Sequence, residues 1–387
     1  MPVKHVAIIG AGIAGLTAAL SLARHGIESD IFEQAEVLTE VGAGLQISPN
    51  ASRILRELGL LDALAAVWME PEAVRLVSGR SLREIASVPS GSFARTRWGA
   101  PYGALHRATL QTTLLAAVKA NPLCRLHFGA RFEAATLDAI GMRLGCRPEL
   151  IVGADGVWSK VRTLVPGSAQ PKFSGNIAWR FAVAEADAPP VLDRTSVTAF
   201  LGPAAHLVCY PLKEAAAFNI VAICAGGGVG HDWNAIASAA QRSLLQRHFA
   251  GWHRDLAALL DGKIEPTLWP LYEVGAGRWH NGRDTVLIGD AAHAMMPFAA
   301  QGAAMAIEDA FELAGAVARR PMPEALDAFE TRRTPRIARL RQRAAFNRFA
   351  YHARGPIRFG RDIVLSLRPP QSLAADLDWI YGYHAIG

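Results

Sequence analysis

Three glycines near the start of the chain, Gly10, Gly12 and Gly15, have the G-x-G-x-x-G spacing of a dinucleotide-binding turn. They follow an apolar run at 6–9 and precede an apolar stretch that predicts a helix. In such a turn the first glycine allows a tight bend, the second lets the backbone approach a pyrophosphate, and the third lets helix and strand pack closely. The free N–H groups of the helix N-terminus would then face the phosphates.

An acidic residue, Glu33, ends the next predicted strand. At this distance from the glycine turn a carboxylate can accept hydrogen bonds from adenosine ribose hydroxyls, which predicts a dinucleotide with an unphosphorylated ribose. The uncharged stretch 6–23 is just long enough to consider as a membrane span, but the three glycines in its first half favour a strand, a turn and a helix. It has no basic n-region and no cleavage site, so no signal peptide is predicted.

Length and composition predict a chain with a sizeable core. The 387 residues allow two domains or one large one, and 51% of them are hydrophobic. The four cysteines are scattered without C-x-x-C or zinc-type spacing, which fits a reduced, cytoplasmic compartment. The formal charge is +6. The arginines between 332 and 368 are predicted to lie on a solvated helix face, and the positive charge would help to gather anionic cofactors and carboxylates.

Hydrophobic periodicity predicts a discontinuous nucleotide-binding fold with a sheet inserted in its middle. The inserted sheet is expected to be antiparallel, with strands at 177–182, 196–201, 206–211 and 218–225 and a helix over about 233–252. Further strands are expected at 73–77, 83–88, 150–153 and 285–288, and helices at 107–120, 302–318 and about 323–350. Asn50 is expected to cap a helix after the loop 41–50. The glycine cluster 226–230 is not a second nucleotide turn, because His231 stands where its last glycine would fall.

Two further segments place polar residues directly after predicted buried strands. The strand 150–153 leads to Asp155 and Gly156, and the strand 285–288 leads to Asp290, followed by Pro297 and the segment 301–309. With the N-terminal turn, they resemble the three fingerprints of the single-component (class A) FAD-dependent aromatic hydroxylases, a family that includes salicylate, 3-hydroxybenzoate and 6-hydroxynicotinate hydroxylases. The resemblance covers nearly the whole chain.

The resemblance implies an α/β fold: a Rossmann-like (GR2-type) FAD-binding domain with an inserted antiparallel β-sheet substrate domain and a helical C-terminus. The expected FAD-binding domain comprises 1–70, 101–170 and 271–387, and the expected substrate domain comprises 71–100 and 171–270. The third fingerprint departs from the family's P-x-x-G-x-G-x-N, because Ala300 and Ala304 replace its first glycine and its asparagine.

The resemblance also implies which residues hold FAD. Gly44, Leu45 and Gln46 would lie beside the isoalloxazine ring, and Asp290 would bind ribityl hydroxyls unless it is only a surface helix cap. Arg107 would approach the pyrophosphate or form an ordinary surface ion pair. Arg162 would support the turn at Asp155. The full expected set is Gly10, Gly12, Ala14, Gly15, Glu33, Gln34, Gly44, Leu45, Gln46, Arg107, Asp155, Asp290, Pro297, Gly302 and Ala303.

The expected catalytic residues are His206, Tyr210 and Gln301. His206 and Tyr210 lie on one face of a predicted strand, and their H-x-x-x-Y-P pattern resembles the substrate strand of the hydroxybenzoate enzymes. His206 could accept the proton of a phenol, although both residues could instead be hydrogen-bonded core residues of the sheet. Gln301 could reach the substrate hydroxyl. Arg180 could clamp a carboxylate or form a structural ion pair.

The implied reaction is hydroxylation of a small hydroxylated aromatic, a hydroxybenzoate-like carboxylate, with bound FAD, transient NADH or NADPH, and O2 through a flavin C4a-hydroperoxide. A flavin-dependent dehydrogenase or reductase of the same fold and a non-catalytic flavin-binding protein are the alternatives. No nucleic acid, membrane or metal partner is expected, and His231, His253, His280 and His293 are expected to be structural. The chain is expected to be a monomer or a homodimer.

Overall fold

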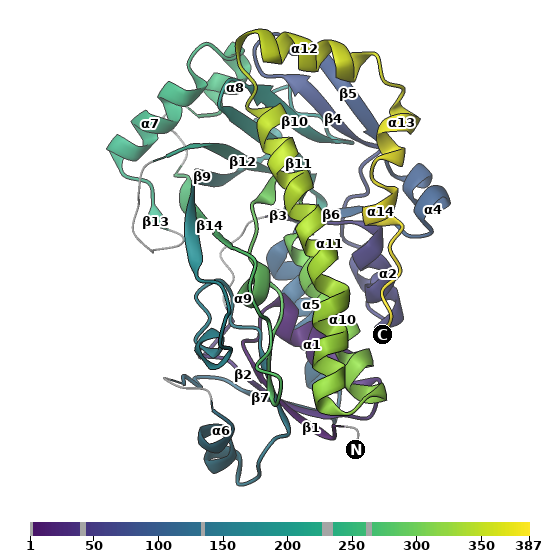
Figure 1. The fold of residues 1–387 in the computed structure, drawn as a ribbon. Helices are drawn as coiled ribbons and strands as arrows, with labels where there is room; N and C mark the ends of the chain where they lie inside the picture. The colour runs from purple at the N-terminus through teal and green to yellow at the C-terminus, as the bar shows by residue number, and fades with distance from the viewer. Residues whose placement is uncertain (1–2, 39–43, 133–135, 227–234, 261–264) are drawn as a thin grey trace.

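The lower part of the molecule in Figure 1 contains a parallel sheet built from distant segments of the chain. The computed structural model describes residues 3–38, 44–132, 136–226, 235–260 and 265–387. The five strands have the order β15-β8-β1-β2-β7. In that order they are β15 (Thr285–Leu287), β8 (Leu150–Gly153), β1 (His5–Ile9), β2 (Glu28–Phe32) and β7 (Cys124–His127).

The central strands of this sheet are almost entirely apolar and buried, as expected of parallel strands covered on both faces. The helix α1 (Ile13–Ala23) follows β1 and packs against α5 (Arg107–Ala120) and α10 (Gly302–Arg319). A side chain at Gly15 would come within 1.9 Å of the Gly10 carbonyl oxygen, so the close helix–strand packing predicted from the third glycine is confirmed. Gly10 itself has φ +104°, a conformation that suits glycine.

The upper part holds an eight-stranded sheet in the order β13-β14-β9-β12-β11-β10-β4-β5. It is antiparallel except between β10 and β4, where the hairpin of β4 and β5 from an earlier part of the chain joins the sheet in parallel. Its strands are β4 (Ala73–Ser78), β5 (Glu84–Pro89), β9 (Pro171–Ala184), β10 (Val197–Gly202), β11 (Ala205–Leu212), β12 (Ala217–Ala225), β13 (Ala235–Ile236) and β14 (Thr267–Val274). The expected domain boundary between 270 and 271 therefore falls inside β14.

The helix expected over 233–252 begins later than predicted. Ala235–Ile236 is the short strand β13, and α7 (Ala239–Phe249) starts after a capping box formed by Ser238 and Gln241. The short helix α8 (Arg254–Ala258) follows. His231 and most of the glycine cluster at 226–230 lie outside the described residues, as does the start of the loop 41–50.

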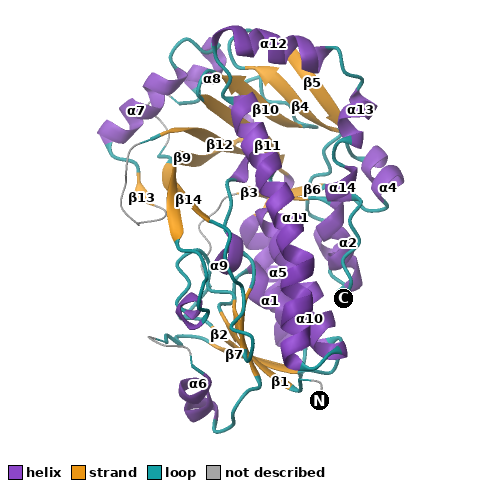
Figure 2. Cartoon of the chain, viewed as in Figure 1, coloured by secondary structure: helices purple, strands orange, loops and turns teal. Residues whose placement is uncertain are grey.

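A long helix, α11 (Met322–Tyr351), runs past both sheets and connects the lower part to the upper part (Figures 1 and 2). The C-terminal helices α12 (Gly355–Ser366), α13 (Pro370–Ala375) and α14 (Asp378–Tyr381) follow it. The remaining elements are β3 (Gly44–Ile47), β6 (Gly103–His106), α2 (Pro49–Glu57), α3 (Leu61–Ala65), α4 (Ser92–Trp98), α6 (Leu137–Leu144) and α9 (Asp290–His293). Together these elements confirm the α/β class with an inserted sheet and a helical C-terminus. Within the described segments, no helix combines the length and the apolar character that crossing a membrane requires.

Candidate active site

A cavity of about 670 Å³ is walled by residues of both large sheets. All of the residues expected to hold FAD line it except Gly15, whose role is packing. They are Gly10, Gly12, Ala14, Glu33, Gln34, Gly44, Leu45, Gln46, Arg107, Asp155, Asp290, Pro297, Gly302 and Ala303. The eight-stranded sheet adds Arg180, His206 and Tyr210. The fold thus brings three distant motifs and one strand face to a single cavity.

The end of the cavity at α1 has the features of a dinucleotide site. The Glu33 carboxylate accepts hydrogen bonds from the backbone N–H groups of Ala11 (2.9 Å) and Ala35 (3.0 Å), which fixes it against the glycine turn. A side chain at Gly12 would meet no protein atom within 4 Å, so packing inside the protein does not require glycine there. The cavity-facing space at Gly12 and the N-terminus of α1 therefore suit a phosphate group.

Asp155 presents an unsatisfied oxygen. Its Oδ2 accepts hydrogen bonds from the backbone N–H groups of Lys160 (2.7 Å) and Val161 (3.2 Å), whereas Oδ1 is buried and has no protein partner. Burial raises the pKa of this carboxyl. Because buried polar atoms in proteins are nearly always hydrogen-bonded, Oδ1 fits a hydroxyl of a bound cofactor.

Arg162 joins the second and third motifs from behind the cavity. Its guanidinium donates to the carbonyl oxygens of Val157 (2.8 Å) and Ala291 (2.8 Å). It is 2% exposed, and its expected structural role is confirmed. Asp290, next to Ala291, starts the short helix α9 with an exposed side chain at the cavity wall.

The strand β3 lies directly against the substrate-side sheet. The Gly44 N–H donates to Asn219 Oδ1 (2.8 Å), and a side chain at Gly44 would come within 2.7 Å of the Tyr210 ring and hydroxyl. The Tyr102 hydroxyl donates to Gln46 Oε1 (2.6 Å). Glycine at position 44 therefore allows β3 and Tyr210 to share one wall of the cavity.

Arg180 is a buried cation without a carboxylate partner. Among the ion pairs of the described residues it takes part in none, and its Nε is buried with no hydrogen-bond acceptor. Its guanidinium lies 4.7 Å from the centre of the Trp269 ring. Burial lowers the pKa of Arg180 to about 10, so the group remains charged at neutral pH. The structural ion pair considered from the sequence is absent from the described part of the chain, and an anion at this cavity wall would be stabilised.

Tyr210 lies on the same sheet face and is 2% exposed. Burial raises the pKa of the Tyr210 phenol above its usual value, and the positive charge of Arg180 only partly opposes this. The phenol therefore keeps its proton at neutral pH and can donate a hydrogen bond into the cavity, but it cannot act there as the acceptor of a substrate proton.

His206 is both a cavity residue and a hydrogen-bonded core residue. Its Nδ1 lies 2.9 Å from Nε2 of His352, and its ring contacts those of Phe298 and Tyr351. Burial, and secondarily the neighbouring His352, hold its pKa well below the usual value of 6.5, so it is a neutral imidazole. His352 follows α11 and is 146 residues away in the chain, and no motif in the sequence indicated it.

The structure does not place Gln301 where the sequence predicted. Its side chain does not line the cavity but donates to Ser48 Oγ (2.9 Å) and accepts from Asn50 Nδ2 (3.3 Å). The reason is its position at the N-cap of α10, where its side chain faces α2. The prediction for Asn50 is also wrong: Ser48 precedes the helix, and Asn50 is buried inside α2.

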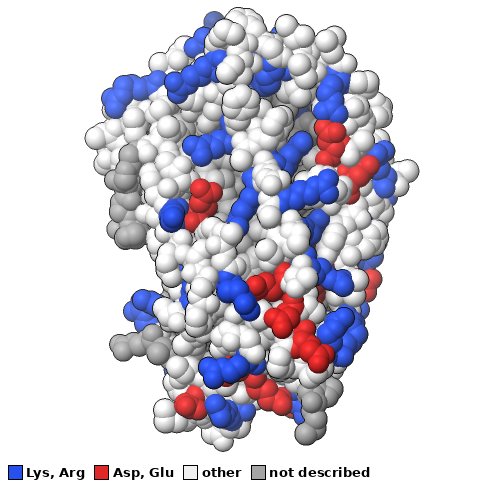
Figure 3. Space-filling model, in the orientation of Figure 1, with Lys and Arg blue, Asp and Glu red and all other residues white. Residues whose placement is uncertain are grey.

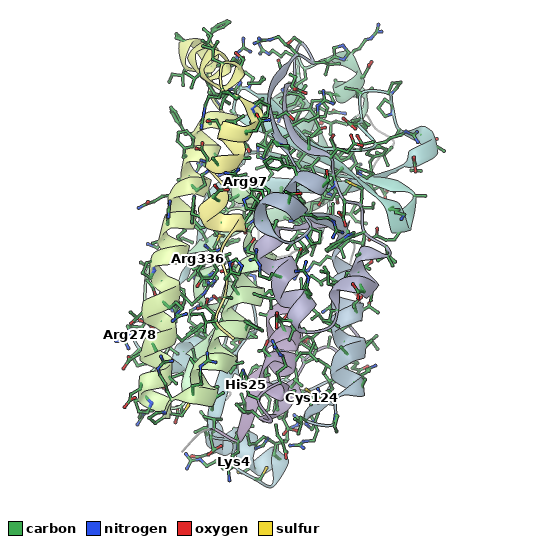
Figure 4. All side chains as sticks on the ribbon, turned by 90° about the vertical axis from the view of Figure 1, so that its right-hand side faces the viewer. Lys4, His25, Arg97, Cys124, Arg278 and Arg336 are labelled. Carbon is green, nitrogen blue, oxygen red and sulfur yellow. The ribbon has the colours of Figure 1, made fainter. Side chains whose placement is uncertain are left out.

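A buried ionic network behind the cavity was not predicted. Arg333 is fully buried and donates to Glu308 (2.5 Å) and Asp309 (2.7 Å), while Arg336 also donates to Glu308 (2.6 Å). The prediction of a solvated helix face is therefore wrong at these two arginines, although Lys and Arg side chains are scattered over the face seen in Figure 3. Figure 4 shows Arg336 on α11 beside the C-terminal segment, where it also donates to backbone carbonyls. The sequence signal for this network was the pair of acids, Glu308 and Asp309, among the apolar residues near the start of α10.

Comparison with known proteins identifies the family. The family model described as "FAD binding domain" matches residues 4–344, nearly the whole chain. The chain belongs to the class A flavin hydroxylase family. FAD is therefore the cofactor of this hydroxylase, in agreement with the glycine turn and the unsatisfied Asp155 oxygen.

Two curated relatives and one solved structure cover almost the full length of this hydroxylase. It is 35% identical to the 3-amino-4-hydroxybenzoate 2-monooxygenase PtnB3 of Streptomyces platensis, over 98% of this chain and 96% of the relative. It is 33% identical to 3-hydroxybenzoate 6-hydroxylase 1 of Aquipseudomonas alcaligenes, over 99% and 98%. The fold matches that of a salicylate hydroxylase substrate complex with a TM-score of 0.80 at 23% identity, covering 99% of this chain and 96% of that one.

Proposed function

We propose that this hydroxylase uses NADH or NADPH and O2 to add a hydroxyl group to a small aromatic that carries a hydroxyl and a carboxylate. The observation that carries the proposal is Arg180, a buried cation without a described carboxylate partner on the wall of the FAD cavity. Support comes from the relatives, whose names state that they act on 3-amino-4-hydroxybenzoate and 3-hydroxybenzoate. These two compounds share the hydroxyl and the carboxylate.

The sheet face offers separate positions for the two substituents. His206 and Tyr210 are four residues apart on β11, which corresponds to about 13 Å along the strand. Arg180 on β9 is opposite Val221 on β12, and Val221 is opposite Val208 on β11. Because Val208 stands midway between His206 and Tyr210 along β11, Arg180 lies across the sheet from the midpoint of that pair. An aromatic ring can therefore place its hydroxyl near His206 and its carboxylate toward Arg180 and Tyr210.

Each side chain then has one task. Arg180 binds the carboxylate by charge, and Tyr210 donates a hydrogen bond to it. His206 accepts the hydrogen bond of the hydroxyl, and withdrawal of that proton makes the ring more electron-rich. Bound FAD would transfer the reducing equivalents of NADH or NADPH to O2 and so supply the activated oxygen. The 18-residue helix α10 begins at Gly302 in the cavity wall, and its positive end stabilises negative charge there.

We also propose the division of the chain into an FAD-binding part (1–70, 101–170 and 275–387) and a substrate part (71–100 and 171–274). The strands of the two large sheets support it, since each sheet draws its strands from one of these sets. A cytoplasmic location is proposed from the four cysteines, all of which are free thiols. The expected oligomeric state is a monomer or a homodimer.

The test is a panel of hydroxyaromatic acids, headed by 3-hydroxybenzoate and 3-amino-4-hydroxybenzoate, incubated with the FAD-loaded protein, NADH or NADPH, and ¹⁸O₂. We expect at least one acid to stimulate nicotinamide oxidation and O2 uptake and to gain one labelled oxygen, detected by mass spectrometry. Product formed without O2 uptake would indicate a dehydrogenase or reductase instead. Retention of FAD with neither activity across the panel would indicate a non-catalytic flavin-binding protein.

A further inference from the structure

A second cavity of about 690 Å³ lies beside the FAD cavity, at the end of α11. The two cavities share one wall residue, Met295. Arg348, Phe349 and Arg354 line the second cavity and are exposed to solvent, so water reaches it from outside. His352 also lies on its wall.

A direct contact between two imidazole rings connects the walls of the two cavities. His206 lines the FAD cavity, His352 lines the second cavity, and their Nδ1 and Nε2 atoms are 2.9 Å apart. The remaining nitrogens are His206 Nε2 and His352 Nδ1, one on each ring. Phe298 and Tyr351 pack against His206, so apolar rings flank the contact. This hydrogen bond between two imidazoles provides a direct connection for a proton between the two cavities.

The surroundings favour neutral rings that pass a proton on. Burial, then the charges of Arg348 and Arg354, lower the pKa of His352 to about 4. A positive charge is therefore disfavoured on this ring at neutral pH, and a proton that arrives there is released. Both arginines are exposed to solvent and line the second cavity.

We propose that His206 and His352 form a two-imidazole relay that carries the hydroxyl proton of the bound aromatic from the FAD cavity to water in the second cavity. The proposal rests on the proposed function, because it requires a substrate hydroxyl at His206. His206 is the group that touches the substrate, and His352 acts through it as a positioning and relay residue.

Every proton that moves in the relay has a donor and an acceptor. At the start His206 carries its proton on Nδ1, donated to His352 Nε2, and its Nε2 lone pair faces the substrate hydroxyl. The O–H bond of the substrate breaks and Nε2–H forms on His206, while the Nδ1 proton moves to His352 Nε2. His352 then loses its own Nδ1 proton to water. Both rings end neutral with their hydrogen bond reversed, the substrate is left as its oxyanion, and one proton has reached solvent.

The test compares wild type with His352→Ala and His352→Gln in the FAD-loaded enzyme, with 3-hydroxybenzoate or the acid of the panel that wild type hydroxylates. We expect both variants to retain FAD and nicotinamide-driven flavin reduction, and to hydroxylate at least tenfold more slowly. His384→Gln is the matched control, because His384 is an exposed histidine outside both cavities, and it should behave as wild type.

Chemical rescue separates a relay from a merely structural role. Imidazole should restore hydroxylation by His352→Ala, whereas pyrazole, a ring of the same size with far weaker basicity, should not. The hydroxylation rate is then measured in mixtures of H2O and D2O and plotted against the fraction of deuterium. The wild-type plot should be curved, which indicates that two protons move in the same step, whereas the His352→Gln plot should be a straight line, which indicates one.

Wild-type rates in both His352 variants, or equal rescue by pyrazole and imidazole, would overturn the relay while leaving the proposed function intact. Failure of the proposed function is a separate result, because the wild type itself would then incorporate no labelled oxygen from any acid.

Discussion

At the scale of single residues, burial decides which cavity groups carry charge. Arg180 stays cationic with a pKa of about 10. Tyr210, whose pKa is raised by burial, and His206, whose pKa is well below its usual value, stay neutral. One positive charge and two neutral hydrogen-bonding groups suit a substrate that is a carboxylate at one end and a phenol at the other.

Replacing Arg180 by Gln should weaken binding of the aromatic acid about 10- to 100-fold, since a hydrogen bond to a charged group contributes about 1.5–3 kcal/mol. KM and the dissociation constant measured by flavin fluorescence report the effect. The matched control is the same substrate without its carboxylate, whose binding should be equally weak in wild type and variant. A wild-type affinity for the acid in Arg180→Gln would exclude Arg180 as the carboxylate site.

Residue types and spacings were sufficient to find the cofactor end of the cavity, because Glu33, Asp155 and Asp290 each follow a strand of one parallel sheet. They were not sufficient for Gln301 or His352. The direction of Gln301 is set by α2, which packs against the start of α10, and the approach of His352 to His206 is set by the path of a helix 30 residues long. Neither contact leaves a local pattern.

At the scale of elements, α10 and α11 are joined through buried charge. Arg333 on α11 lies between Glu308 and Asp309 of α10, and Asp309 also contacts His293 of α9 (2.5 Å) and the N–H of Gly289 (2.9 Å). The network therefore fixes both the start of α10 and the strand-to-helix turn that carries Asp290.

Arg333→Met should destabilise the fold by about 3–5 kcal/mol, because it removes the fully buried cation that Glu308 and Asp309 share. Urea unfolding followed by far-UV circular dichroism measures the change. Arg332→Met is the control. The Arg332 side chain is 42% exposed and its Nε lies 3.9 Å from Glu312 Oε2, so this substitution should lower the free energy of unfolding by less than about 1 kcal/mol. Equal losses in the two variants would contradict the assigned importance of the buried network.

Elements with strong periodicity were predicted to the residue, as for the helix 107–120 and the strand 150–153. The start of α7 was missed because the apolar residues before Ser238 belong to a strand that pairs with β14, and pairing between distant segments overrides a helical pattern. The parallel β10–β4 pair was missed for the same reason, since no local signal specifies which strands become neighbours.

At the scale of the whole molecule, groups with lowered pKa values make the fold sensitive to acid. His206 and His352 have pKa values below 6.5 in the fold, and Asp309, despite a burial that alone would raise its value, is held at about 2 by His293 and Arg333. In each case the unfolded chain binds the proton first as pH falls, so the free energy of unfolding decreases.

Stability should therefore fall as pH drops below about 6.5 through the histidine pair, with the His352 contribution lost by about pH 4, and again from about 4 to 2 through Asp309. Urea unfolding at a series of pH values measures both steps. His352→Gln should flatten the upper step and leave the lower one, while Asp309→Asn should do the reverse. A stability that stays constant between pH 6.5 and 4 would contradict neutral burial of the histidines.

The strand order of the parallel sheet also affects how the chain is made. β1 is its central strand and leaves the ribosome first, yet β15, at 285–287, is the last strand to join. At about 5–20 residues per second, roughly 15–55 s of translation separate the two strands. During that interval the nascent chain exposes apolar strand edges. We expect chaperones that bind such edges to determine how much enzyme a cell accumulates, and slow codons between the two strands to reduce the yield.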